Sequence, residues 1–257
     1  MAGFLSKLQF SGQSNSSLAQ NKAKLPFRDP EDPRIIYKNS DRAQRIALKV
    51  KPSDREVTVI VPGIRSLPKA MRFARQQKDW IEVQLESLPP AQPFVPDAPI
   101  LFEGEIFRLV HPGKRGRPYI DREAREIVVP APADTFEGRV KRLLIREARE
   151  QLQKSTRVYA DMLGRPVEKI QVRDTSSRWG SCITRNGKGH ISYSWRLISA
   201  PHFVLDYVAA HECAHMIEAN HSAAYWAIVA DIFPDFKKAK KWLNANGAYL
   251  HAVGATF

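Results

Sequence analysis

The stretch that most constrains the fold is an apolar segment that carries metal-binding and acidic side chains. Residues 204–217, VLDYVAAHECAHMI, are apolar enough to be buried, and they contain His211, Glu212 and His215. On an α-helix His211 and His215 are four positions apart, so both lie on one face. Buried polar groups are costly unless they find partners. A metal ion would satisfy these groups together, so the segment predicts a buried helix that holds a metal.

Zinc suits this donor set, because Zn²⁺ binds neutral imidazole nitrogens in a tetrahedral arrangement. Glu212 directly follows His211 and flanks the metal position, where it can take a proton from a zinc-activated water, as in H-E-x-x-H hydrolases. The competing interpretation is that two helical histidines are ordinary surface residues. The apolar surroundings favour the metal site, with Glu212 as general base.

A catalytic zinc needs a third protein ligand and an open position. No glutamate follows Glu218, which leaves several candidates downstream, namely His221, Asp231, Asp235 and His251. We favour His221, since Asn220 tolerates the left-handed turn that would bring it back toward the metal. The spacing from His215 to His221 equals that of the metzincin motif, although Glu218 stands where that motif has glycine.

The first half of the chain divides by pattern into an arm and a β-rich region. Residues 1–33 are rich in polar residues and end in RDPEDP, which indicates a flexible arm. Residues 34–133 carry short β-branched runs, and those before Pro62 predict an antiparallel meander. A helix is expected from Ser66 to the Pro89-Pro90 pair, followed by further strands around EIFRLVH, RPYID and EIVVP. No internal repeat is evident.

Residues 134–257 predict a second domain that contains the metal segment. A long helix is expected over residues 135–163, then two strands joined by a turn at Asn186-Gly187. The second strand, GKGHISYSW, is a candidate exposed edge that could pair with an extended substrate. Three helices should follow, at about residues 201–219, 222–233 and 235–246, with Gly247 ending the last one.

Several motifs in a fixed order make a more specific pattern than the histidines alone. DTSSRWGSC, SYSWRLISAP, VLDYVAAHECAHMIEANHSAAYW and PDFKKAKKWLNANGAYLH strongly resemble the YgjP-like zinc metallopeptidase family, which is related to SprT-like proteases. The similarity covers nearly the whole chain after about Ile35, and Cys213, where the family often has leucine, is a departure.

The resemblance implies an α+β fold in which an N-terminal antiparallel β-rich region with a helix precedes a compact zincin-type metallopeptidase domain. It also implies one Zn²⁺ ion on His211, His215 and His221, with Glu212 as general base and a peptide or protein as substrate.

A hydrolase of this kind also needs a donor for the oxyanion of its tetrahedral intermediate. Residue type alone leaves four candidates open, namely Tyr225, Tyr193, Arg178 and His202. Tyr225 lies in the amphipathic run AAYWAIV, where an aromatic ring more often belongs to the core. Arg178 has two interpretations, an ion-pair anchor for its loop or a contact to substrate, and the anchor is the simpler one.

The overall charge leaves a second function open. Lys and Arg number 40 against 27 Asp and Glu, a net charge of +13, and such a surface attracts nucleic acid weakly and without sequence preference. The alternatives are therefore a zinc protein that acts on DNA- or RNA-bound proteins, or a zinc-binding module without catalysis.

The sequence says less about the cellular location and the oligomeric state of the protein. Two cysteines are too few for a disulfide framework and favour reduced thiols in the cytoplasm. We expect no secretory signal in the first residues, and no run approaches the roughly 20 apolar residues of a membrane span. The sequence does not indicate an oligomeric state.

Overall fold

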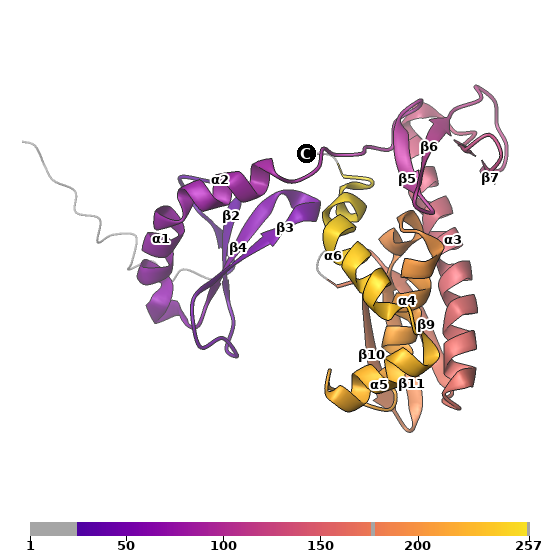
Figure 1. Ribbon diagram of the computed structural model, residues 1–257. Helices are drawn as coiled ribbons and strands as arrows, with labels where there is room; N and C mark the ends of the chain where they lie inside the picture. The colour runs from indigo at the N-terminus through magenta and orange to yellow at the C-terminus, as the bar shows by residue number, and fades with distance from the viewer. Residues whose placement is uncertain (1–24, 176–177, 256–257) are drawn as a thin grey trace, which may run out of the picture. The chain divides into compact units, whose positions relative to one another are not determined.

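The structure is a computed structural model that describes residues 25–175 and 178–255 (Figure 1). It divides into two units: the described residues up to Val50 together with Glu56–Gln84, and Lys51–Arg55 together with the chain from Leu85 onward. Residues 1–24 of the predicted arm, residues 1–33, lie outside the described part. The predicted domain limits at residues 33/34 and 133/134 stay predictions.

The first unit is a four-stranded sheet followed by helices. Its strands lie in the order β1, β2, β4, β3, with the bounds β1 (Phe27–Arg28), β2 (Ile35–Asn39), β3 (Ala47–Lys51) and β4 (Glu56–Val61). The turn η2 (Pro52–Asp54), between β3 and β4, belongs to the second unit. The short turn η3 (Ile64–Ser66) and the helices α1 (Leu67–Gln76) and α2 (Lys78–Glu86) follow β4. The expected single helix is therefore two helices, which separate at Gln77, where the backbone has φ −97° and ψ 15°.

The predicted antiparallel meander is wrong for this sheet, because β2 and β4 are parallel neighbours and β3 lies at the edge. Burial explains this order. In β4 every second residue is fully buried, as Val57, Val59 and Val61 are 0% exposed, which fits a central strand. No residue of β3 is buried, and its two lysines suit an edge.

The second unit begins with another four-stranded sheet in which the same strand order recurs. Its strands lie in the order β5, β6, β8, β7, with the bounds β5 (Pro99–Phe102), β6 (Glu105–Val110), β7 (Tyr119–Asp121) and β8 (Glu126–Val128). In both sheets the third strand in sequence lies outside the fourth, and the second and fourth are parallel. Arg55 and Arg125, each just before the fourth strand, both have positive φ, at 49° and 53°. The structure therefore contains a repeat that the sequence pattern did not reveal.

The rest of the second unit is an α+β assembly around one small sheet. Its elements are α3 (Ala133–Met162), β9 (Val167–Arg173), β10 (Gly180–Arg185), β11 (Lys188–Ser194), η4 (Trp195–Ser199), α4 (His202–Ala214), α5 (Ala223–Ile232) and α6 (Phe236–Ala252). The overall class is thus α+β, as predicted. α3 packs along α4 and η4, and α4 also contacts α5, α6, β10 and β11 (Figure 1).

The strand that was expected to be an exposed edge is central. β11 pairs antiparallel with β10 and parallel with β9, so both of its backbone edges are occupied. The expectation that substrate would pair with residues 187–195 is therefore wrong. The turn between β10 and β11 does have the predicted residues, with Asn186 at φ 50° and Gly187 at φ 74°, as a tight two-residue hairpin requires.

Two helix ends differ from the sequence expectation. α4 ends at Ala214 rather than near Ala219, because the amides of Met216, Ile217 and Glu218 turn back onto the carbonyls of Cys213 and Ala214. α6 continues through the expected stop at Gly247. A Cβ at that glycine would lie 3.3 Å from the Trp179 ring, so the missing side chain admits the indole there.

Among the described residues, no helix is both long enough and apolar enough to cross a membrane.

The helices of the second unit pack against one another through a shared hydrophobic core. Fully buried side chains on α3, including Leu144 and Leu152, belong to the same hydrophobic cluster as Val204, Leu205 and Val208 of α4. Packing against α3 therefore fixes the helix that carries the histidine pair.

We expect Leu152→Ala to lower the free energy of unfolding by about 2–5 kcal/mol, because a fully buried leucine leaves a cavity when it is truncated. Val158→Ala is the matched control, since Val158 is on the same helix and is 50% exposed. Urea unfolding followed by circular dichroism gives both values. Equal stability of the two variants would contradict the packing role of α3.

Candidate functional site

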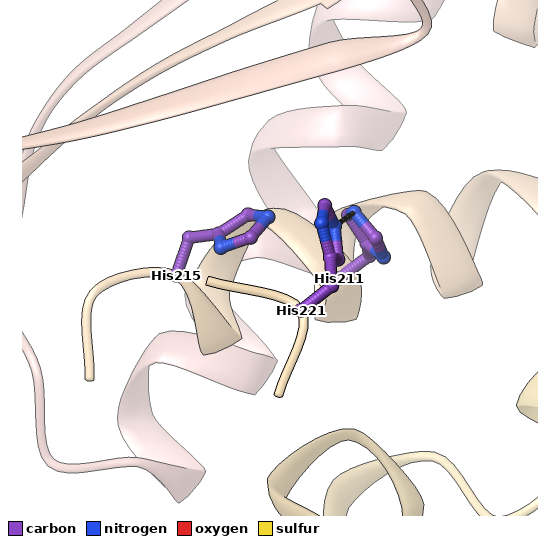
Figure 2. A group of neighbouring side chains, drawn as sticks. All are labelled: His211, His215 and His221. Carbon is purple, nitrogen blue, oxygen red and sulfur yellow. Dashed lines mark hydrogen bonds between the residues drawn. The ribbon is translucent and has the colours of Figure 1, made fainter. Parts of the chain in front are cut away.

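The end of α4 and the loop that follows it bring three imidazoles together. His211 is in the last turn of α4, His215 follows that helix directly, and His221 precedes the start of α5. One ring nitrogen from each of the three lies within 4.8 Å of the other two. Figure 2 shows the three rings converging from the helix and from the loop. The loop returns to the helix because Ser222 caps α5 and its hydroxyl accepts from the Tyr225 amide at 3.2 Å.

The distance between two of the imidazoles fits a single tetrahedral metal ion. The Nε2 atoms of His211 and His221 are 3.2 Å apart. Two nitrogens on one Zn²⁺, each at about 2.0–2.1 Å with tetrahedral angles, would be separated by about 3.3 Å. The pair formed by His211 and His221 therefore has the spacing that zinc requires.

A hydrogen bond orients the His215 ring and leaves its Nε2 available. The Nδ1–H of His215 donates to the carbonyl of Glu218 at 3.1 Å, which leaves the lone pair on Nε2. The hydroxyl of Tyr207, one turn before His211, lies 3.5 Å from the Nδ1 of that histidine. The Tyr225 ring stacks on His215 at 4.5 Å between centroids, and its hydroxyl donates to the His211 carbonyl at 2.9 Å.

Burial keeps two of the imidazoles, those of His211 and His215, in the form that binds metal. It lowers the pKa of His211 to about 3, and the charges of His215 and His221 act in the same direction. The pKa of His215 is also lowered by burial, against a rise from its bond to Glu218. Metal ligands must be deprotonated, so neutral histidines at ordinary pH match the proposed role of the cluster.

Glu212 lies beside the cluster as a buried carboxylate. Its side chain is 4% exposed, and its Oε2 has no hydrogen-bond partner among the described residues. Burial raises the pKa of Glu212 to about 8, and the charge of Arg178 acts in the opposite direction. A cation bound by the nearby imidazoles would favour the carboxylate form and lower this pKa.

Gly180 is what allows the Glu212 carboxylate to occupy this position. A Cβ at Gly180 would lie 2.4 Å from Oε1 and 2.7 Å from Cδ of Glu212, closer than atoms can pack. The first residue of β10 must therefore lack a side chain for the carboxylate to sit against the strand.

A cavity of about 540 Å³ opens beside the histidines and the carboxylate. His211, His221 and Glu212 line it, together with residues from the start of β10 and from α4, α5 and α6. The walls are largely aromatic and aliphatic, with Trp179, Tyr207, Trp226 and Leu243 among them. An apolar cavity with a few convergent polar groups is the usual form of a ligand site.

The other candidates from the sequence lie in different places. Arg178 lines the cavity, whereas Tyr225 forms the aromatic backing of the three imidazoles. Tyr193 is 0% exposed, and its hydroxyl bonds that of Thr156 at 2.9 Å. His202 lines a separate cavity with Asp206. Asp231 and His251 are outside the three-histidine cluster.

Sequence reasoning missed several residues that shape the site. Tyr207 is four positions before His211, so helical spacing could have found it. Lys240 belongs to a run of lysines in the sequence, and only the fold places it at the cavity. The sequence could not identify the backbone carbonyl of Glu218 as the partner of His215, because every residue has such a carbonyl.

Three converging imidazoles beside a buried carboxylate, on a mixed α+β fold, are the kind of site that metal-dependent hydrolases use. The model of the YgjP-like metallopeptidase domain matches residues 44–246, most of the chain, and this protein belongs to the YgjP-like family. A metallopeptidase family implies a bound metal ion and a peptide or protein substrate. Comparison with curated proteins gave no match, and comparison with solved structures gave none either.

We expect Gly180→Ala to lower the free energy of unfolding by about 1–3 kcal/mol, because the new methyl group collides with the Glu212 carboxylate. Gly63→Ala is the control, since no atom lies within 4 Å of a Cβ built there. In a Glu212→Ala background the Gly180→Ala cost should disappear, because the colliding atoms are gone. An undiminished cost in that background, measured by urea unfolding, would refute the contact as its cause.

Proposed function

We propose that the protein is a zinc metallopeptidase in which His211, His215 and His221 hold one Zn²⁺ ion and Glu212 is the general base. The observation that carries this proposal is the 3.2 Å separation of the His211 and His221 Nε2 atoms, next to a buried carboxylate without a partner. Imidazole ligands suit zinc among the common divalent metals. When bound, zinc supplies Lewis-acid polarisation of a carbonyl and lowers the pKa of water to about 7.

The chain's own groups supply the remaining chemistry. Glu212 holds its free Oε2 at the cavity, where it can accept a proton from the attacking water and pass it to the leaving amine. The apolar walls lower the polarity around the reacting bond, which strengthens the electrostatic interactions there. Of the candidates for contact to the substrate we keep Arg178, because it lines the cavity, whereas the Tyr193 and Tyr225 hydroxyls are bonded elsewhere.

A zinc-binding module without catalysis is the weaker alternative. A structural zinc site is closed by four protein ligands, whereas three of the described residues form this cluster and a cavity lies beside it.

The free thiols of Cys182 and Cys213 support the proposal of a cytoplasmic location.

We expect Glu212→Gln to keep one zinc per chain and to lower peptide turnover by at least 10²-fold, the usual contribution of a general base, about 10²–10⁴-fold. His221→Ala should lose zinc affinity as well as turnover, because it removes one of three ligands. Metal analysis of the purified chains and mass spectrometry of a peptide-library digest measure the two effects.

His190→Ala is the matched control for the metal analysis, since His190 is on β11 and outside the cluster. Zinc content that is unchanged in His221→Ala would exclude His221 as a ligand. Peptide cleavage that survives in Glu212→Gln would exclude the base.

Association with nucleic acid is a second candidate, and one observation in the first unit favours it. A cavity of about 610 Å³ is lined by Arg45, Lys69 and Arg72 and by no acidic side chain. Among the described residues these three cations form no ion pair. Unpaired cations around one hollow are suited to phosphate groups.

We expect the Lys69→Gln/Arg72→Gln double variant to bind non-specific DNA more weakly at low salt. The slope of its log K against log salt should become shallower by about 2, close to one for each phosphate that is no longer neutralised. Lys38→Gln is the control, an exposed lysine of β2 that does not line the cavity. Fluorescence anisotropy with a labelled duplex measures both. The slope of the double variant matching that of the control would remove this cavity as a nucleic-acid site.

A further inference from the structure

Two cations stand at the cavity beside the three imidazoles. Arg178 precedes β10 and Lys240 is on α6, and both side chains line this cavity. Their charges lie close enough to act on the site itself, that of Lys240 on His211 and that of Arg178 on Glu212. Within residues 25–175 and 178–255, neither side chain forms an ion pair or a side-chain hydrogen bond.

Aromatic contacts fix Lys240 with respect to the candidate metal ligands. Its Nζ lies 4.2 Å from the centroid of the Trp226 ring. The same indole stacks on His221, with centroids 5.7 Å apart and 26° between planes, and on Phe236 at 5.5 Å and 20°. A cation over an aromatic face is held by the quadrupole of the ring. The ammonium group is therefore positioned by an indole that also contacts a ligand of the proposed zinc.

The balance of charge in the cavity favours an anionic substrate group. Glu212 is the acidic residue among those that line the cavity, and in the proposed mechanism it is occupied with the proton of the attacking water. Within the described residues neither cation is paired with a carboxylate, although the charge of Arg178 acts on Glu212. Both side chains are exposed, so an incoming carboxylate can reach them directly and pair with them.

We propose that this cavity selects peptides with a carboxylate close to the scissile bond, and that Arg178 and Lys240 bind this carboxylate. The inference rests on the proposed peptidase function and gives it a substrate class. Arg178 can engage both oxygens of a carboxylate with its planar guanidinium, whereas Lys240 acts as a point charge. The carboxylate has two possible sources, the side chain of an Asp or Glu residue and the free C-terminus of the peptide.

The test uses the zinc-loaded full chain. A peptide library first locates the bond that is cleaved, and matched peptides then differ at one position, with Glu, Gln or Lys on either side of that bond. Each peptide is made with a free and with an amidated C-terminus. We expect kcat/KM for the carboxylate-bearing peptides to exceed that of their amide counterparts by about tenfold or more, the usual effect of a charge-assisted hydrogen bond.

Comparison of the two peptide series identifies the source of the carboxylate. A preference for Glu over Gln that survives amidation assigns the carboxylate to a side chain. A preference that amidation abolishes assigns it to the C-terminus, and the enzyme then removes residues from chain ends.

Variants link this preference to the two cations. Arg178→Gln and Lys240→Gln should each reduce it, chiefly through a higher KM for the acidic peptide, and the double variant should lose it. Lys241→Gln is the matched control, since it removes the same charge from the next residue of α6, which is exposed and does not line the cavity. The Arg178→Glu/Lys240→Glu variant should cleave Lys peptides faster than Glu peptides. A misfolded enzyme would lose activity on both peptides and could not show this reversal.

Cleavage by the wild type without any preference for carboxylate overturns this inference and leaves the peptidase function standing. A preference that persists in the double Gln variant overturns the roles of Arg178 and Lys240. Absence of cleavage for every peptide overturns the peptidase function, and this inference with it.

Discussion

The burial of a carboxylate between two half-buried imidazoles, at the end of one apolar helix, is the constraint on which the rest of the structure depends. α4 is almost wholly enclosed, with Val204 and Ala209 0% exposed and Glu212 at 4%. Polar groups held this deep destabilise a fold unless something compensates them. Neighbouring elements contribute to this compensation. The loop after α4 brings His221 to the other two imidazoles, and Tyr225 of α5 donates a hydrogen bond to the His211 carbonyl. Gly180, the first residue of β10, leaves room for the Glu212 carboxylate.

The early end of α4 has a specific effect on this arrangement. Had the helix continued to Ala219, the carbonyl of Glu218 would lie a turn further along its axis. Instead the chain folds over after His215, and the Glu218 carbonyl receives the Nδ1–H of that ring. The ring is therefore oriented by the same turn that directs His221 back toward the helix. One local break in the helix fixes the geometry of two of the three imidazoles.

Much of the fold and of the candidate site follows from sequence, and the failures have physical causes. Periodicity predicts a long helix over residues 135–163, observed at 133–162, and the three helices that follow, and the spacing of His211 and His215 places both on one face. Strand order was not predictable in the same way, because it depends on which strands pair in the folded sheet, and the alternating pattern of β4 does not name its neighbours. Gly247 failed as a helix stop because packing of Trp179 against it outweighs its low helix propensity. Lys240 resembles its neighbours Lys237 and Lys241 in the sequence, and only the fold places it over Trp226.

The recurring strand order means that the chain uses one architectural module twice. In each copy four strands in the order first, second, fourth, third are followed by a helix, α1 in one case and α3 in the other. The copies differ in what their helix supports: α1 contacts its own sheet, whereas α3 is the scaffold for α4 and the elements around it. Among the described residues, the first copy of this module carries no histidine cluster. The elements that form the proposed catalytic site follow the second copy along the chain.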